Sequence, residues 1–144
     1  SSWSMLECLE HLNMYGDFYL PQIENKINQS KTTSDDTFKS GWLGKYFVDS
    51  MLPKDKLNKM KTFKDKNPIH AELDKKVIER FIQQQMRLLD LLDKSRTISL
   101  NKVKISTSIS SLIKLKLGDT FQFFINHILR HMKQIEKIEI IRSK

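Results

Sequence analysis

Three long segments of the chain repeat apolar residues at α-helical spacing, and this pattern restricts the possible folds most. They run from about residue 4 to 28, 67 to 93 and 120 to 141, with an apolar side chain every three or four residues. The 144 residues include only four glycines and three prolines, too few for the frequent turns of a β-sandwich or barrel. The sequence therefore predicts an all-α helical bundle, and its length fits a single domain over residues 1–144.

Each predicted helix has a recognisable start. Ser4 and Glu7 have the spacing of a capping box, in which each residue's side chain accepts a hydrogen bond from the other's backbone. We expect the second long helix to open at Asn67-Pro68, with the asparagine as cap and the proline in the first turn. Asp119 and Gln122 suggest a second capping box at the start of the last helix.

The connecting segments differ in character. Residues 29–37 are polar and predict a loop, whereas residues 41–52 predict a short helix that lays aromatic side chains over one end of the core. Residues 53–67 are rich in lysine and predict a solvated connection. Between residues 94 and 117, apolar residues alternate with lysines, which predicts extended chain with two short strands.

The net charge of +8 raises the question of an anionic partner. Six of the lysines fall in the predicted connection, and the other charges are scattered without interleaved aromatic residues, which argues against nucleic-acid binding. Cys8 is the one cysteine, so there is no internal disulfide and a reducing, cytoplasmic location is expected. No apolar run approaches the roughly 20 residues of a membrane span.

Three of the four histidines fit a metal site. His127 and His131 are four residues apart, so one helix face offers two imidazoles to a single ion. His11 lies beside the apolar stripe of the first helix and can supply a third nitrogen, leaving other coordination positions for water or substrate. His70, just after Pro68, is expected to be solvated. Such histidines also occur as packing residues, so the spacing alone leaves both interpretations open.

Two motifs carry a resemblance to a known family. The stretch Trp3-Ser4 through His11-Leu12 resembles the start of the second helix of DinB/YfiT-like proteins, and His127 through Gln134 resembles the "H-x-x-R-H-x-x-Q" signature of their last helix. The resemblance covers essentially the whole chain. It implies a DinB-like four-helix bundle that binds a divalent metal, often nickel, zinc or iron, through three histidines, which correspond here to His11, His127 and His131.

The resemblance also implies a range of functions. Some members are similar to thiol S-transferases or metal-dependent hydrolases that act on small molecules, and many have no assigned activity. We therefore expect either a metal-dependent transferase or hydrolase, with a low-molecular-weight thiol among its candidate substrates, or a non-catalytic metal-binding or structural helical module. Neither the metal nor the substrate follows from the sequence. Arg130 and Gln134 are candidates for orienting groups near the metal.

One departure from the family pattern concerns assembly. The family has a helix before the Trp-Ser motif, and this sequence starts at that motif. We therefore expect preceding residues or a partner subunit to complete the bundle, with a homodimer as one solution. One of the first two long helices should then have an apolar face that this chain does not cover.

Overall fold

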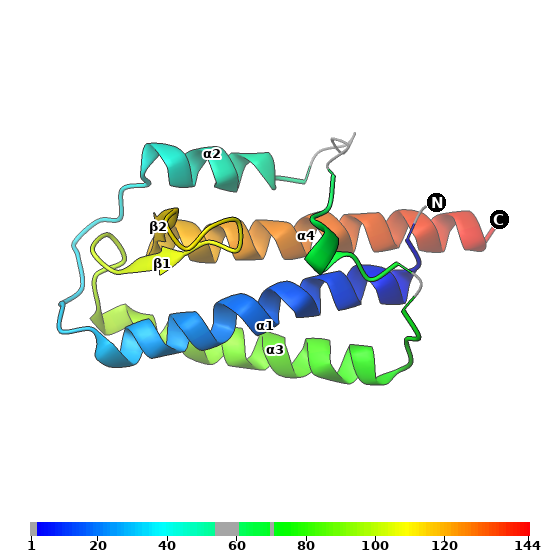
Figure 1. The fold of residues 1–144 in the computed structure, drawn as a ribbon, viewed down its shortest axis with the longest axis horizontal. Coiled ribbons are helices and arrows are strands. Elements are labelled where there is room, and N and C mark those ends of the chain that lie inside the picture. Colours follow the sequence, from blue (N-terminus) through cyan, green and yellow to red (C-terminus); the bar gives the residue numbers. More distant parts are fainter. Residues whose placement is uncertain (1–2, 54–60, 70) are drawn as a thin grey trace.

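The structure is a computed structural model that describes residues 3–53, 61–69 and 71–144. Within these ranges it is a helical bundle with one small antiparallel sheet (Figure 1). The helices are α1 (Met5–Gln29), α2 (Trp42–Ser50), α3 (Lys76–Lys94) and α4 (Leu117–Arg142), with short 3-10 turns η1 (Lys64–Lys66) and η2 (Ser95–Thr97). Strands β1 (Lys104–Ser106) and β2 (Lys114–Lys116) pair in the region where two short strands were predicted.

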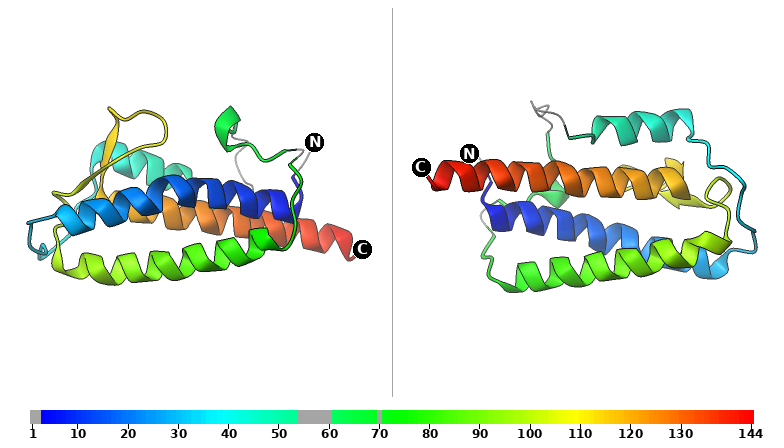
Figure 2. Two further views of the ribbon diagram at one scale, coloured as in Figure 1. Left: turned by 60° about the horizontal axis from the view of Figure 1, so that its bottom comes forward. Right: turned by 180° about the vertical axis from the view of Figure 1, so that it is seen from behind.

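The long helices are arranged around α1. This helix packs against both α3 and α4, while α2 packs against α4 on the far side, so that α3 forms an edge of the molecule (Figures 1 and 2). The sheet contacts α1 and α4 and buries Ile105 and Leu115, one from each strand. None of the α-helices within the described ranges has the length and apolar character needed to cross a membrane.

Helix α1 begins as predicted and continues through a proline. Ser4 Oγ accepts a hydrogen bond from Glu7 N (3.1 Å), and the Glu7 carboxylate accepts one from Ser4 N (2.6 Å). Pro21 lies inside the helix, where a proline costs about 3 kcal/mol. Leu20 and Ile23 are fully buried beside it, and burying such side chains contributes about 1.5–3 kcal/mol each, which offsets that cost.

The second long helix starts later than predicted. It begins at Lys76 and not at Asn67-Pro68. Asn67 Oδ1 accepts a hydrogen bond from Ile69 N (3.2 Å), which makes a local turn instead of a helix cap. Asp74 Oδ1 accepts one from Lys76 N (2.8 Å), and the helical pattern starts there.

The predicted capping box of the last helix was also wrong. Helix α4 follows β2 directly at Leu117 and has no side-chain cap. The buried carboxylate of Asp119 instead accepts hydrogen bonds from Gly41 N (2.9 Å) and from Ser40 Oγ at the start of α2. Asp119 therefore ties α2 to α4.

The short helix at residues 41–52 covers the core less than expected. Phe47 packs against the core, but Trp42 is 85% and Tyr46 67% exposed. Aromatic residues of α4 are more deeply buried: Phe124 is 3% exposed, and its ring lies 6.2 Å from that of Tyr19 in α1. The core therefore lies mainly between α1, α4 and the sheet.

Candidate metal centre

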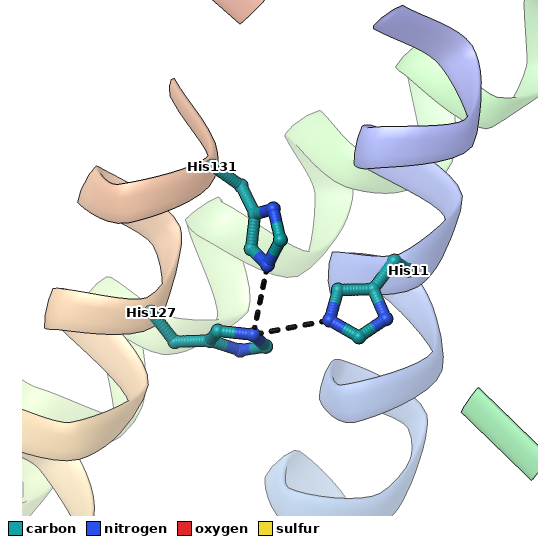
Figure 3. Close-up of side chains that lie close together, drawn as sticks. All are labelled: His11, His127 and His131. Atoms are coloured by element: carbon teal, nitrogen blue, oxygen red, sulfur yellow. Dashed lines mark hydrogen bonds between the residues drawn. The ribbon is translucent and has the colours of Figure 1, made fainter. Parts of the chain in front are cut away.

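His11, His127 and His131 lie together at the interface of α1 and α4. Nε2 of His127 is 3.1 Å from Nε2 of His11 and 3.1 Å from Nε2 of His131. Figure 3 shows the three rings pointing toward one another, one from α1 and two from successive turns of α4. All three potential ligand atoms lie within 4.8 Å of one another. The four-residue spacing in α4 and the packing of α1 on α4 together produce this cluster.

The spacing suits a metal ion. Two imidazole ligands at about 2.0–2.1 Å from a tetrahedral ion have nitrogens about 3.3 Å apart. The observed separations of 3.1 Å are close to that value. The third pair, His11 and His131, has ligand atoms within 4.8 Å of each other, so these two rings would adjust their positions around a shared ion.

The outer ring nitrogens of two histidines are held by hydrogen bonds. His11 Nδ1 donates to the backbone carbonyl of Lys66 in η1 (2.7 Å). His131 Nδ1 pairs with the side-chain oxygen of Gln134, one turn further along α4 (2.9 Å). Because a carbonyl oxygen only accepts, both Nδ1 atoms carry the hydrogen, and in the neutral rings Nε2 has a free lone pair.

Aromatic rings surround the cluster. Trp3 stacks on His131 at a centroid distance of 5.9 Å and lies 4.7 Å from the ring of His11. Tyr15 meets His127 edge-on at 4.6 Å, and Phe123 stacks on His127 at 6.0 Å. These contacts restrict the orientation of the imidazoles.

Burial keeps the histidines neutral. His11, His127 and His131 are 4%, 5% and 9% exposed. Desolvation lowers the pKa of His11 below its usual 6.5 and that of His127 well below it, and it lowers the pKa of His131 to about 3. Since a neutral imidazole is the form that binds metal, the cluster is in its ligating state over a wide pH range.

A comparison with protein families identifies the family of the chain. A profile of the DinB superfamily matches residues 1–135. The chain belongs to the DinB superfamily. Comparison with curated proteins and with solved structures gave no match. The resemblance noted in the sequence is therefore confirmed, as is the helical fold it implies.

This DinB-superfamily chain has a large cavity beside the cluster. It encloses about 1010 Å³, and all three histidines line it. Most of the wall is aromatic or apolar, with Arg130 and Gln134 of α4 among its polar groups. Burial lowers the pKa of Arg130, which is 7% exposed. A site of this form can admit a small molecule with an apolar body directly to the three imidazoles.

The sequence identified part of this arrangement. It selected the three clustered histidines, and it named Gln134 as a candidate orienting group. In the structure Gln134 Oε1 lies 2.9 Å from His131 Nδ1. His70 lies outside the described residues. The sequence did not indicate Lys66, whose segment was expected to be a solvated connection. Its side chain is only 14% exposed and its carbonyl holds His11.

Cys8 plays no visible part in the site. It lies on α1 one turn before His11 but is completely buried among core residues. Burial and, to a smaller extent, the charge of Glu7 raise the pKa of its thiol to about 12. The side chain is therefore a neutral core group and not a nucleophile.

Proposed function

We propose that this DinB-superfamily protein binds a divalent metal ion through His11, His127 and His131 and is a metal-dependent thiol S-transferase or hydrolase acting on a small molecule. The observation that carries the proposal is the hydrogen bonding of the outer ring nitrogens of His11 and His131, from which the positions of the ring hydrogens follow. Lys66 and Gln134 accept the Nδ1 hydrogens of His11 and His131, so each of those rings directs a bare Nε2 at His127.

This pattern favours an ion at the centre over simple packing. Nε2 of His127 can carry one hydrogen at most in a neutral ring, and it has another Nε2 at 3.1 Å on each of two sides. One hydrogen cannot serve both neighbours well, so one lone pair would face another across a short distance. A cation between the three nitrogens would satisfy all of them at once.

The cavity supports a reactive site more than a structural one. A structural zinc site usually has four protein ligands, whereas three ligands leave a position for substrate or water. A bound divalent ion supplies a Lewis acid, which lowers the pKa of a coordinated thiol or water. The aromatic wall would hold an apolar substrate and exclude bulk water, and Arg130 would place a positive charge near an anionic group of the substrate.

Elemental analysis of the purified protein tests metal binding. We expect about one divalent ion per chain in the unaltered protein and a loss of tight binding in His127→Ala and His131→Ala, because each variant lacks one of three ligands. His70→Ala is the control, since it removes a histidine that the proposal does not use. Circular dichroism should show that the helices remain in each variant. Full metal content in His127→Ala, or its loss in His70→Ala, would show that the wrong histidines were chosen.

The catalytic part needs a separate experiment. In the cobalt-substituted protein, adding a low-molecular-weight thiol should change the visible spectrum if the thiol enters the coordination sphere, and a panel of thiol-transfer and ester substrates should show turnover. The His131→Ala variant should show neither effect. A metal-loaded protein with no spectral response to thiols and no turnover across the panel would support a non-catalytic metal-binding module instead.

A further inference from the structure

Exposed apolar side chains from three segments border the opening of the cavity. Tyr46 of α2, Phe63 just before η1 and Ile109 of the loop between β1 and β2 all line the cavity, yet they are 67%, 52% and 45% exposed. They therefore lie where the cavity opens to solvent. Trp42, one turn before Tyr46, and Leu112, in the same loop as Ile109, are 85% and 89% exposed. We call these five residues the mouth patch, and an exposed apolar patch of this kind marks an interaction surface.

Positive charge is concentrated in two of the same segments. Residues 61–66 and 102–116 contain seven lysines and one aspartate, so these 21 residues carry +6 of the net charge of +8. Lys61 lines the cavity together with Phe63. The fold brings these segments and α2 to one side of the bundle, and Figures 1 and 2 show that this side is the one away from α3.

The lysines of the sheet have no acidic partner within the described ranges. Lys104 of β1 is directly opposite Lys116 of β2. Both lie on the outer face of the sheet, because the alternate residues Ile105 and Leu115 are buried in the core. Like charges directly opposite each other destabilise a sheet, and Lys116 Nζ donates only to an uncharged group, the backbone carbonyl of Lys39 (2.7 Å). An anionic surface facing the sheet would offset this repulsion.

We propose that the mouth patch and the lysines around it bind the surface of an anionic lipid bilayer. Tryptophan and tyrosine favour the boundary between headgroups and acyl chains, and apolar side chains such as Ile109 and Leu112 at the tip of the hairpin insert into it. In this orientation the lysines lie among the anionic headgroups. Such peripheral binding needs no membrane-spanning helix. The cavity then opens toward the lipid, whether or not the histidine cluster holds a metal ion.

The composition of this surface favours a bilayer over a nucleic acid. Bases stack on aromatic rings, but they offer no partner to an exposed aliphatic side chain such as Leu112, whereas acyl chains do. Arginine, which forms bidentate hydrogen bonds with phosphate, is absent from residues 61–66 and 102–116, and every basic residue there is lysine. Lysine is the residue expected where charge attraction to headgroups is enough.

Co-sedimentation of the full chain with lipid vesicles tests the proposal. We expect binding to phosphatidylcholine vesicles that contain about 30% phosphatidylserine and much weaker binding to phosphatidylcholine alone, because the lysines need anionic headgroups. High salt should reduce the binding. No binding to the anionic vesicles at low salt would overturn the proposal. Retention on DNA without binding to vesicles would also overturn it and would assign the surface to a nucleic acid.

Leu112→Asp tests insertion of the hairpin tip. This side chain is 89% exposed, so the fold should remain, and we expect the vesicle partition coefficient to fall at least about tenfold because an inserted apolar group is replaced by a negative charge. Leu89→Asp is the matched control, since Leu89 is 67% exposed on α3, on the other side of the bundle, and should have little effect. Circular dichroism should be unchanged in both variants. Equal losses of binding in the two would overturn the proposal.

Removal of charge tests whether the position of the lysines is important beyond the net charge. We expect Lys104→Gln combined with Lys114→Gln to lower the partition coefficient about tenfold to thirtyfold, because each lysine near an anionic surface contributes about fivefold. Lys75→Gln combined with Lys76→Gln removes the same charge from the exposed start of α3 and should have little effect. A similar loss in both double variants would overturn the assignment to this face. Metal content is a separate measurement on the same variants, so either result leaves the proposed function unaffected.

Discussion

The orientation of each imidazole depends on what its outer nitrogen contacts. His131 Nδ1 pairs with Gln134 Oε1, and His11 Nδ1 with the carbonyl of Lys66. These partners determine which nitrogen carries the hydrogen and hence which nitrogen can bind metal. A histidine without such a partner would exchange between two tautomers, and only one of them presents Nε2 to the cluster. Gln134 and the Lys66 carbonyl are therefore part of the site although neither would touch the metal.

Replacing Gln134 should weaken metal binding without removing a ligand. In Gln134→Leu the Nδ1 hydrogen of His131 loses its acceptor, and we expect metal affinity to fall about tenfold to a hundredfold. Gln134→Glu keeps an acceptor oxygen at the same position and should retain tight binding. Competition with a chromophoric chelator measures both variants. Equal affinities for the leucine and glutamate variants would contradict this role of Gln134.

Cys8 should be unreactive in the folded protein. Its thiol is completely buried and its pKa is raised to about 12, so at pH 8 almost none is thiolate. Ellman's reagent should react with native Cys8 at least about a hundredfold more slowly than with the same protein in denaturant. A cysteine placed at exposed Ser111 in a Cys8→Ala background should react at the ordinary rate. Rapid labelling of native Cys8 would mean that the thiol is accessible.

The residues of the site differ in how well the sequence could predict them. His127 and His131 are visible because four-residue spacing on a helix places two rings on one face, and the motif around His11 adds the third. The role of the Lys66 carbonyl could not be predicted from the sequence, because every residue has a carbonyl group and Lys66 is 55 positions from His11. Trp3 belongs to the motif that ends at His11 and Leu12, but that motif did not predict that its ring would contact His11 and His131.

At the scale of whole elements, close contact between α2 and α4 shapes one end of the molecule. Gly44 of α2 is buried directly against the carboxylate of Asp119 in α4. The same carboxylate holds the start of α2 through Ser40 and Gly41. The sequence placed all the helices but misjudged where α3 and α4 begin. Asn67 and Asp119 have cap-forming side chains, and which backbone group each one bonds depends on tertiary contacts.

Gly44→Ala should destabilise the protein, contrary to the usual effect of this change in a helix. Alanine normally stabilises a helix interior by about 0.5–1 kcal/mol relative to glycine. Here the added Cβ would collide with the Asp119 carboxylate, and we expect the free energy of unfolding to fall by about 1–3 kcal/mol. Urea denaturation measures the change. In an Asp119→Gly background, which also removes the Asp119 Cβ that lies 2.7 Å from the added Cβ, the cost should largely disappear. A Gly44→Ala protein more stable than the original would refute the contact.

For the molecule as a whole, the histidine cluster joins segments that are distant in the sequence. His11 and His127 are 116 positions apart, and the η1 segment joins them through the carbonyl of Lys66. A ligand that binds only when these segments are assembled stabilises the folded state. The stabilisation grows with the logarithm of the ligand concentration divided by its dissociation constant. Metal binding should therefore raise the melting temperature of the whole bundle.

Acid should destabilise the chelator-treated protein over the pH range in which free histidine titrates. The pKa values of His11, His127 and His131 are all lowered in the folded state, whereas in the unfolded chain they return to about 6.5. As pH falls below 6.5, the unfolded chain therefore binds more protons than the folded chain does. Each histidine that stays neutral in the folded state lowers the free energy of unfolding by up to about 1.4 kcal/mol per pH unit. Above about pH 7 both states are neutral and these groups contribute no pH dependence.

Thermal melting between pH 8 and pH 5 in the presence of a chelator tests this dependence, because most carboxylates remain ionised over that range. The melting temperature should be nearly constant above pH 7 and fall steadily below 6.5. His131→Ala, which removes one of the three groups with a lowered pKa, should show a shallower decline. Divalent metal should raise the melting temperature most near pH 8 and progressively less as protons compete for the ligands. A chelated protein with equal stability at pH 7 and pH 5 would mean that the histidines titrate normally, and hence that the cluster is open to water.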